Sequence, residues 1–230
     1  MKTIGLIGGM SWESTLEYYR IINETVKEKL GKNHSAKCLL YSVDFAEVGK
    51  LQHEGKWNEL AQLMVNAAQR LEKGDADFII ICANTMHKVA EDVQNNVNIP
   101  ILHIVDAVAE KILAKGLAKV GLLGTKFTME EDFYKKRLNE KFAIDVIIPD
   151  TKEMEIIHNV VYNELCQGVI NPASREKFKE VIKNLNVKGA EGVILGCTEI
   201  PLLIKQEDVE IPVFDTTSIH AKAAVELALK

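Results

Sequence analysis

The sequence predicts an α/β protein of two similar lobes, each a parallel sheet flanked by helices, and three observations support this prediction. Apolar stretches of strand length alternate with helical patterns along the whole chain. One strand-like segment occurs twice at an offset of 114 residues, as ADFIIICANTMH from Ala76 and as AEGVILGCTEI from Ala190. The chain of 230 residues is 47% hydrophobic, enough to bury one large core or two modest ones.

The duplication extends beyond this one strand. TIGLIGGM from Thr3 resembles KVGLLGTK from Lys119, and IPILHIVDA from Ile99 resembles IPVFDTTSI from Ile211. A period of this length is too long for a solenoid, whose repeats run about 20 to 50 residues. We therefore expect two lobes of related architecture.

The first half begins with an apolar strand that runs into a glycine loop. Ser11 suits the N-cap of the helix that follows, and Gly74 lies where a later amphipathic helix should end. The expected strands are 3–9, 38–45, 78–84 and 99–104, and the expected helices are 11–30, 57–74 and 87–94.

The second half repeats this order. Strands are expected at 119–125, 144–149, 192–197 and 211–216, and helices at 129–139, 153–167 and 174–185. Strands joined by crossover helices form parallel sheets with helices on both faces.

Composition argues against several classes of protein. A net charge of -5 leaves no basic excess, so we expect no nucleic-acid partner. The apolar N-terminal stretch is too short for a secretion signal, and nothing approaches the roughly 20 apolar residues of a membrane span. The cysteines show no CxxC or disulfide spacing, which indicates a cytoplasmic protein; they are Cys38, Cys82, Cys166 and Cys197.

Ligands of such sheets bind beyond the carboxyl ends of the strands, so the residues that follow each strand are the candidates for a site. Four strand ends carry small or polar residues: 8–11, 83–85, 124–125 and 197–199. The glycine loop at 8–11 favours an anion or simply makes a tight turn. Its spacing is not that of a dinucleotide or P-loop motif, so no nucleotide cofactor is expected.

Cys197 is the strongest single candidate. A strand end that faces a helix N-terminus lowers a thiol pKa, and Pro201 suits the opening turn of such a helix; the alternative is a small buried hydrophobic residue. Ala83 is its counterpart in the first copy. Cys82, one residue earlier, should face the other side of the sheet unless a bulge turns it round.

The histidines give weaker signals. His87 lies at the start of a helix, where it either orients a carboxyl group or serves as a solvent-facing or capping residue. None of the six histidines forms an H-x-H or H-E-x-x-H spacing, so we expect no metal site.

GLIGGMSWEST, CANTMH and LGCTEIP together resemble the aspartate/glutamate racemase superfamily, and the resemblance to its aspartate/glutamate-specific and broad-specificity amino-acid racemases spans the chain. The resemblance implies a homodimeric, cofactor-free enzyme. Its lobes, 1–98 with 210–230 and 99–209, would close on one amino acid in the cleft between them. One acid/base residue from each lobe would remove or return a proton at Cα.

Carried over by position, Cys197 matches the acid/base cysteine of the second lobe, and Ala83 occupies the acid/base position of the first. Relatives commonly have cysteine or threonine there, and alanine can neither take nor give a proton. Cys82, Thr85 or a water molecule could replace the missing group. The resemblance assigns substrate binding to Met10, Ser11, Gln52, Asn84, Thr85, Cys166, Thr198 and Glu199.

Three functions remain open at this point. The first is a racemase of aspartate, glutamate or a related amino acid with an unusual partner for Cys197. The second is a single-cysteine decarboxylase or proton-exchange enzyme without a cofactor. The third is an inactive amino-acid-binding relative.

Overall fold

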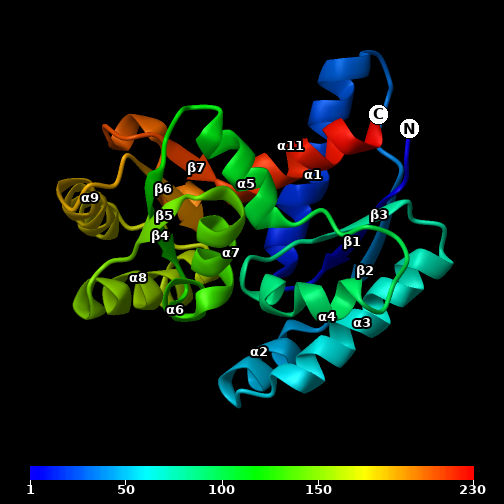
Figure 1. The fold of residues 1–230 in the computed structure, drawn as a ribbon, viewed down its shortest axis with the longest axis horizontal. Coiled ribbons are helices and arrows are strands. Elements are labelled where there is room, and N and C mark those ends of the chain that lie inside the picture. The colour runs from blue at the N-terminus through cyan, green and yellow to red at the C-terminus, as the bar shows by residue number, and fades with distance from the viewer. The chain divides into compact units, whose positions relative to one another are not determined.

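The computed structural model describes all 230 residues, which divide into two compact units: Met1–Ala107 with Thr217–Lys230, and Val108–Thr216. Strands and helices alternate in both (Figure 1). The first unit contains β1 (Ile4–Gly8), α1 (Trp12–Leu30), β2 (Cys38–Ser42), α2 (Phe45–His53), α3 (Trp57–Lys73), β3 (Phe78–Ile81), the 3-10 helix η1 (Thr85–Val89), α4 (Ala90–Gln94) and most of α11 (Thr216–Ala228).

The sheet of the first unit has the order β2-β1-β3, and all its strands are parallel. Every residue of β1 and β3 is buried, as expected for strands covered on both faces. Their carboxyl ends therefore lie at one edge of the sheet, where Gly8 and Ile81 lead into the loops of interest.

Two helical layers cover this sheet. On one face, α11 runs beside α1 (Figure 1), and Tyr18, Ile22 and Ala221 pack with the β3 side chains of Phe78 and Ile80. On the other face, α3 and its neighbours pack against the alternate residues of β3 in a core that includes Met64, Leu71, Ile79 and Ile81. The strand period of two thus decides which layer each side chain of β3 joins.

The second unit contains the remaining elements, with the end of α5 and the start of α11. They are α5 (Ile104–Leu113), β4 (Lys119–Gly124), α6 (Lys126–Glu130), α7 (Asp132–Phe142), β5 (Asp145–Ile147), α8 (Thr151–Asn163), the 3-10 helix η2 (Leu165–Gln167), α9 (Pro172–Val187), β6 (Gly192–Gly196), α10 (Ile200–Leu203), the 3-10 helix η3 (Gln206–Asp208) and β7 (Val213–Asp215).

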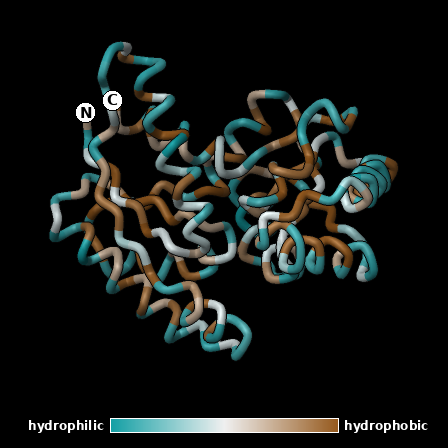
Figure 2. The backbone as a smooth tube through the Cα atoms, turned by 180° about the vertical axis from the view of Figure 1, so that it is seen from behind, coloured by the Kyte–Doolittle hydropathy of each residue, from teal (hydrophilic) through white to brown (hydrophobic).

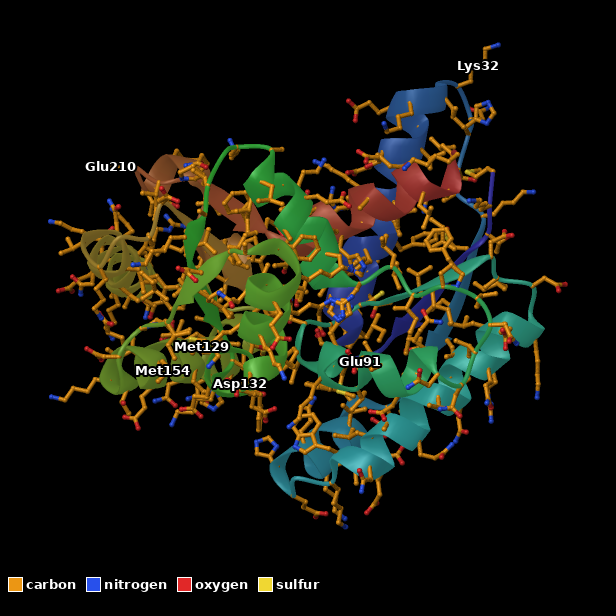
Figure 3. The ribbon with its side chains drawn as sticks, in the orientation of Figure 1. Lys32, Glu91, Met129, Asp132, Met154 and Glu210 are labelled. Atoms are coloured by element: carbon orange, nitrogen blue, oxygen red, sulfur yellow. The ribbon has the colours of Figure 1, made fainter.

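Its parallel sheet has the order β5-β4-β6-β7. One face carries a core in which Leu123 and Leu195 pack with residues of α8 and α9, together with Met129 and Met154, labelled in Figure 3. Apolar residues concentrate along the strands of both units (Figure 2). No helix combines the length and apolar character needed to cross a bilayer.

Three local expectations differ from the structure. The predicted strand 99–104 is reduced to a single bridge between Ile79 and Ile101, because α5 already begins at Ile104. The predicted helix 129–139 is divided into α6 and α7 at Glu131, whose backbone is extended. Helix α2 was not predicted from the sequence; Asp44 caps it by accepting a hydrogen bond from the Ala46 amide.

The limits of the two units also differ from those expected. Residues 99–107 belong with the first unit, where Ile101 pairs with Ile79. Residues 210–216 belong with the second, because β7 pairs with β6. The chain therefore passes from the first unit to the second within α5 and returns at the start of α11.

Candidate active site

The loop after β1 requires a glycine at position 9, because there is no room for a side chain. Gly9 has a φ of 90°, and a Cβ atom there would lie 2.2 Å from the carbonyl oxygen of Val43. The Gly9 amide donates to Thr15 Oγ1 at 2.8 Å, and Ser11 caps α1 by accepting from the Ser14 amide, as predicted. The tight-turn interpretation of this loop is thus supported.

Cys82 and Ala83 lie on opposite faces of the first sheet. Cys82 is fully buried in the cluster that contains Tyr18 and Ile22, and burial raises the pKa of its thiol. Ala83 belongs to the cluster on the other face, with Met10 and Met86. No bulge reverses this alternation, so Cys82 does not take the place of a base at Ala83.

The other predicted residues of the first unit gather around η1. Asn84 precedes this helix and is buried, and Thr85, its first residue, is partly exposed. Gln52 is buried on α2, and its side-chain amide contacts the sulfur of Met86 at 3.2 Å. Residues of α2 and η1 therefore lie next to each other, close to the strand end at Ala83.

His87 is neither solvent-facing nor directed at an open site. It is 3% exposed, its Nδ1 lies 2.8 Å from the Ala83 carbonyl oxygen, and its Nε2 accepts from the Ile104 amide at 3.2 Å. Of the interpretations considered, the structure supports capping, although the helix that His87 caps is α5 and not its own.

Cys197 directly follows strand β6 of the second unit, and its thiol is hydrogen-bonded to a carboxylate. Its thiol donates to Glu199 Oε2 at 2.9 Å, and the Thr198 hydroxyl donates to the same oxygen at 2.7 Å. Cys197 and Glu199 are each 9% exposed, so the pair is largely shielded from water without being sealed. Ala83, the counterpart of Cys197 in the first copy, has the same 9% exposure.

This environment contradicts the expectation of an acidified thiol. Burial raises the pKa of Cys197 well above its ordinary value, and the negative charge of Glu199 raises it further. The helix that Pro201 opens, α10, has only four residues, too few for a strong dipole at its N-terminus. Cys197 is therefore held in its protonated form, as a thiol that donates a hydrogen bond to Glu199.

Tyr162 is a neighbour of this pair that the sequence did not reveal. Burial raises the pKa of its hydroxyl to about 12. The proximity of three groups that carry negative charge when ionised, Cys197, Cys166 and Glu199, raises this pKa further. Cys166 lies in η2, partly buried beside the same core. The spacing of four residues between Tyr162 and Cys166 was the only available signal, and it is common in any helix.

The two units thus offer different chemistry at equivalent strand ends. Around Cys197 the second unit has a proton donor, Glu199 as an acceptor and the hydroxyl of Thr198. Around Ala83 the first unit has the amide of Asn84 and the hydroxyl of Thr85, but no strong base. No group of three or more histidine, cysteine or acidic side chains is arranged to hold a metal ion.

Two parallel-sheet units with polar residues beyond the carboxyl ends of their strands are typical of two-domain α/β enzymes. The sequence pattern described as Asp/Glu/Hydantoin racemase matches residues 7–224, and the chain belongs to this family of amino-acid racemases.

Its relatives cover the chain completely or in part. The broad-specificity amino-acid racemase RacX of Bacillus subtilis is 24% identical over 98% of both chains. A glutamate racemase of Hydrogenobaculum is 31% identical over 63% of this chain and 53% of its own.

Solved structures agree with the fold over the full length. A Yersinia pestis protein named only as a candidate Asp/Glu racemase is 53% identical, with a TM-score of 0.95 and complete coverage of both chains. An aspartate racemase homologue from Pyrococcus horikoshii is 44% identical, with a TM-score of 0.89 and the same coverage.

Proposed function

We propose that the protein exchanges the Cα proton of aspartate, glutamate or a related amino acid without a cofactor, with Cys197 as the acid/base residue and Ala83 at the opposing position. The observation that carries this proposal is the bonded pair of Cys197 and Glu199 at the end of β6. The names of the relatives, which specify aspartate, glutamate or a broad range of amino acids, support the substrate class.

A buried, protonated thiol must lose its proton before it can remove one from Cα, and we assign the Glu199 carboxylate as the acceptor of that proton. In the removal step the Glu199 carboxylate takes the thiol proton, and the resulting thiolate takes the proton from Cα. The electron pair of the Cα–H bond moves into the substrate carboxylate. In the return step the Cys197 thiol gives its proton to Cα and recovers one from Glu199.

Stabilisation of the enolate-like carboxylate requires hydrogen-bond donors. Asn84 and Thr85 at the first strand end are the donors that we assign to this role, with Met10, Ser11, Gln52, Cys166 and Thr198 completing the pocket. Binding of one amino acid by both lobes would bring these groups to the same substrate.

The methyl group of Ala83 makes the two faces of the substrate unequal. Cys82 points into the opposite layer, so the second proton must come from Thr85 or from water in the space left by the missing side chain. Near neutral pH neither gives and takes a proton as readily as a thiol with its thiolate, and we therefore propose slow racemisation.

The same observation favours a second candidate, a one-sided enzyme. With Cys197 alone, a proton removed from one face returns to that face, and Cα exchanges without inversion. A malonate-type substrate that loses carbon dioxide would need only the return step, delivered to one face.

Incubation of the protein with L- and D-glutamate and aspartate in deuterium oxide separates these activities. Deuterium at Cα together with a change in optical rotation supports racemisation, whereas deuterium with retention supports the one-sided enzyme. Cys197→Ala should abolish both, with Cys38→Ala as the control for loss of a thiol. An absence of exchange in the folded wild-type protein would refute both activities for these substrates and leave an amino-acid-binding protein.

The homodimer, the cytoplasmic location and the lack of a cofactor stay predictions.

A further inference from the structure

A cluster of three histidines lies inside the first unit, although 16 and 117 residues separate its members along the sequence. The ring of His87 packs edge-on against His103 with centroids 4.6 Å apart and against His220 at 5.7 Å. All three side chains are buried, with exposures of 3%, 8% and 0%. The proposed reaction uses none of them, so their burial needs another explanation.

The partners of each ring fix its proton positions. A carbonyl oxygen only accepts and a backbone amide only donates, so His87 must carry its proton on Nδ1, towards Ala83, and a lone pair on Nε2, towards Ile104. His220 carries a proton on Nε2, towards the Leu102 carbonyl, and its Nδ1 lies 2.9 Å from the Tyr18 hydroxyl, which can donate or accept. Burial lowers the pKa of His220 to about 4, so at neutral pH Nδ1 has no proton and accepts from this hydroxyl. Both rings are therefore neutral and held in one tautomer.

Two of these rings cap the N-terminus of the same helix, α5. The first four amides of a helix have no partner within it, and at α5 the Ile104 amide donates to His87 Nε2 while the Val105 amide donates to His103 Nδ1. A positive ring would oppose both amides and the positive end of the helix dipole. The cap thus works only with neutral histidines.

His87 thereby joins two segments with different tasks. Its Nδ1 holds the carbonyl of Ala83, the counterpart of Cys197 in the first copy of the repeat, and its Nε2 holds the first residue of α5, the helix in which the chain passes to the second unit. His220 adds α11, the helix of the return passage, through its contact with His87.

We infer that His87 is a positioning residue that fixes the Ala83–Thr85 strand end through a single neutral tautomer and links it to the N-terminus of α5. The inference rests on the proposed function for its effect on the reaction, because Asn84 and Thr85 in this segment are the assigned carboxylate donors. His87 itself touches no reacting atom. Without it, the Ala83 carbonyl and the Ile104 amide lose their partners, and the strand end is free to shift.

The chain offers a matched control. His53 on α2 makes the same local contact, from its Nδ1 to the carbonyl oxygen of Gly49 four residues earlier at 2.7 Å, but it is exposed. Loss of this ring should change little, because water replaces the bond.

The first test is spectroscopic and needs no activity. Nitrogen-15 NMR of histidine-labelled protein at neutral pH should show His87 protonated on Nδ1 only, with the signal assigned by its absence in His87→Gln. A ring protonated on Nε2, or on both nitrogens, would overturn the inference even if the proposed function is correct.

The second test measures Cα exchange and KM. His87→Leu should raise KM by about tenfold or more, since two buried backbone groups lose a partner. His87→Gln, whose amide offers one donor and one acceptor, should recover most of that loss, and His53→Leu should match the wild type. An equal increase in KM for His87→Leu and His87→Gln at equal thermal stability, or no increase for either, would refute the positioning role.

If the wild type exchanges the Cα proton of no amino acid, the proposed function fails, and amide hydrogen exchange at 83–85 and 104–105 tests the inference instead. Protection lost in His87→Leu and kept in His87→Gln supports the inference. Unchanged protection in His87→Leu refutes it.

Discussion

Replacement of Glu199 by glutamine tests the chemistry of the Cys197 thiol directly. Glutamine keeps the shape of the side chain and an oxygen that can accept from Cys197 Sγ, but it removes the negative charge 2.9 Å away. That charge opposes thiolate formation, so its removal should lower the pKa of Cys197.

Two unit charges about 4 Å apart interact by about 4 kcal/mol at an effective dielectric constant of about 20. The replacement of a charged hydrogen-bond acceptor by a neutral one accounts for about 1 kcal/mol even without this long-range term. The exposure of 9% admits some water and reduces the Coulomb energy. We therefore expect Glu199→Gln to stabilise the thiolate by about 1 to 4 kcal/mol and so to lower the pKa of Cys197.

The assay is the pH dependence of alkylation by iodoacetamide, quantified on the peptide that contains Cys197 so that the other three cysteines do not contribute. Glu207→Gln removes an exposed charge from η3 of the same unit and should leave the Cys197 pKa unchanged. Glu199→Gln should also slow Cα exchange, by about a hundredfold or more, because the proton acceptor is lost although the thiol is more acidic. An unchanged or raised Cys197 pKa would refute the assignment of Glu199 as its charged partner.

Three further changes test other parts of the structure. Ala83→Cys should raise inversion at Cα by about a hundredfold by supplying the missing acid/base group, measured by optical rotation, and a folded variant without gain would show that this position does not face the substrate. Burial lowers the pKa of His220 from 6.5 to about 4, so the unfolded chain binds a proton in this window that the native state does not. Stability should therefore be fully present above pH 6.5 and fall by roughly 3 kcal/mol towards pH 4, a slope in urea titrations that His220→Gln should flatten. Gly9→Ala should cost about 2 kcal/mol or more, since its φ of 90° and the 2.2 Å approach of a Cβ to Val43 both oppose a side chain; equal stability by thermal unfolding would contradict this.

The sequence predicted most of what local patterns determine. Continuous apolar runs gave β1, β3, β4 and β6, and the residues after these runs gave Ala83, Thr125 and Cys197 as strand-end positions. Parallel pairing followed from the helical crossovers, and the structure has it in both sheets. These features depend on periodicity and on chain direction, which a sequence shows directly.

Segments 99–104 and 211–216 show where local pattern fails. They resemble each other, yet 213–215 forms a strand that pairs with β6, whereas 99–104 makes one bridge and turns into α5. The difference arises from tertiary contacts: His87 and His103, the former distant in sequence, cap the helix that begins at Ile104. No local signal distinguishes the two segments.

The acidity of Cys197 was mispredicted for a similar reason. The strand end at Cys197, with Pro201 four residues later, predicts a helix N-terminus that would favour a thiolate. Whether the carboxylate of Glu199 points to the thiol depends instead on its side-chain conformation, which the sequence does not show. Burial raises the pKa of the thiol, and the contact with Glu199 raises it further. Tyr162 and the histidine cluster escaped detection because their members meet only after folding.

The discontinuity of the first unit has a consequence for biosynthesis. Helix α11 supplies Ala221, Ala224 and Val225 to one face of the first sheet, yet the ribosome makes this helix only after the whole second unit. Until then α1 alone covers this face of the sheet, and Ile4, Leu6 and other apolar side chains stay partly exposed while the second unit is made. Chains released at Thr216 should accordingly bind an apolar dye and attract chaperones, whereas the longer chain should not; equal dye binding by both would contradict this order of assembly.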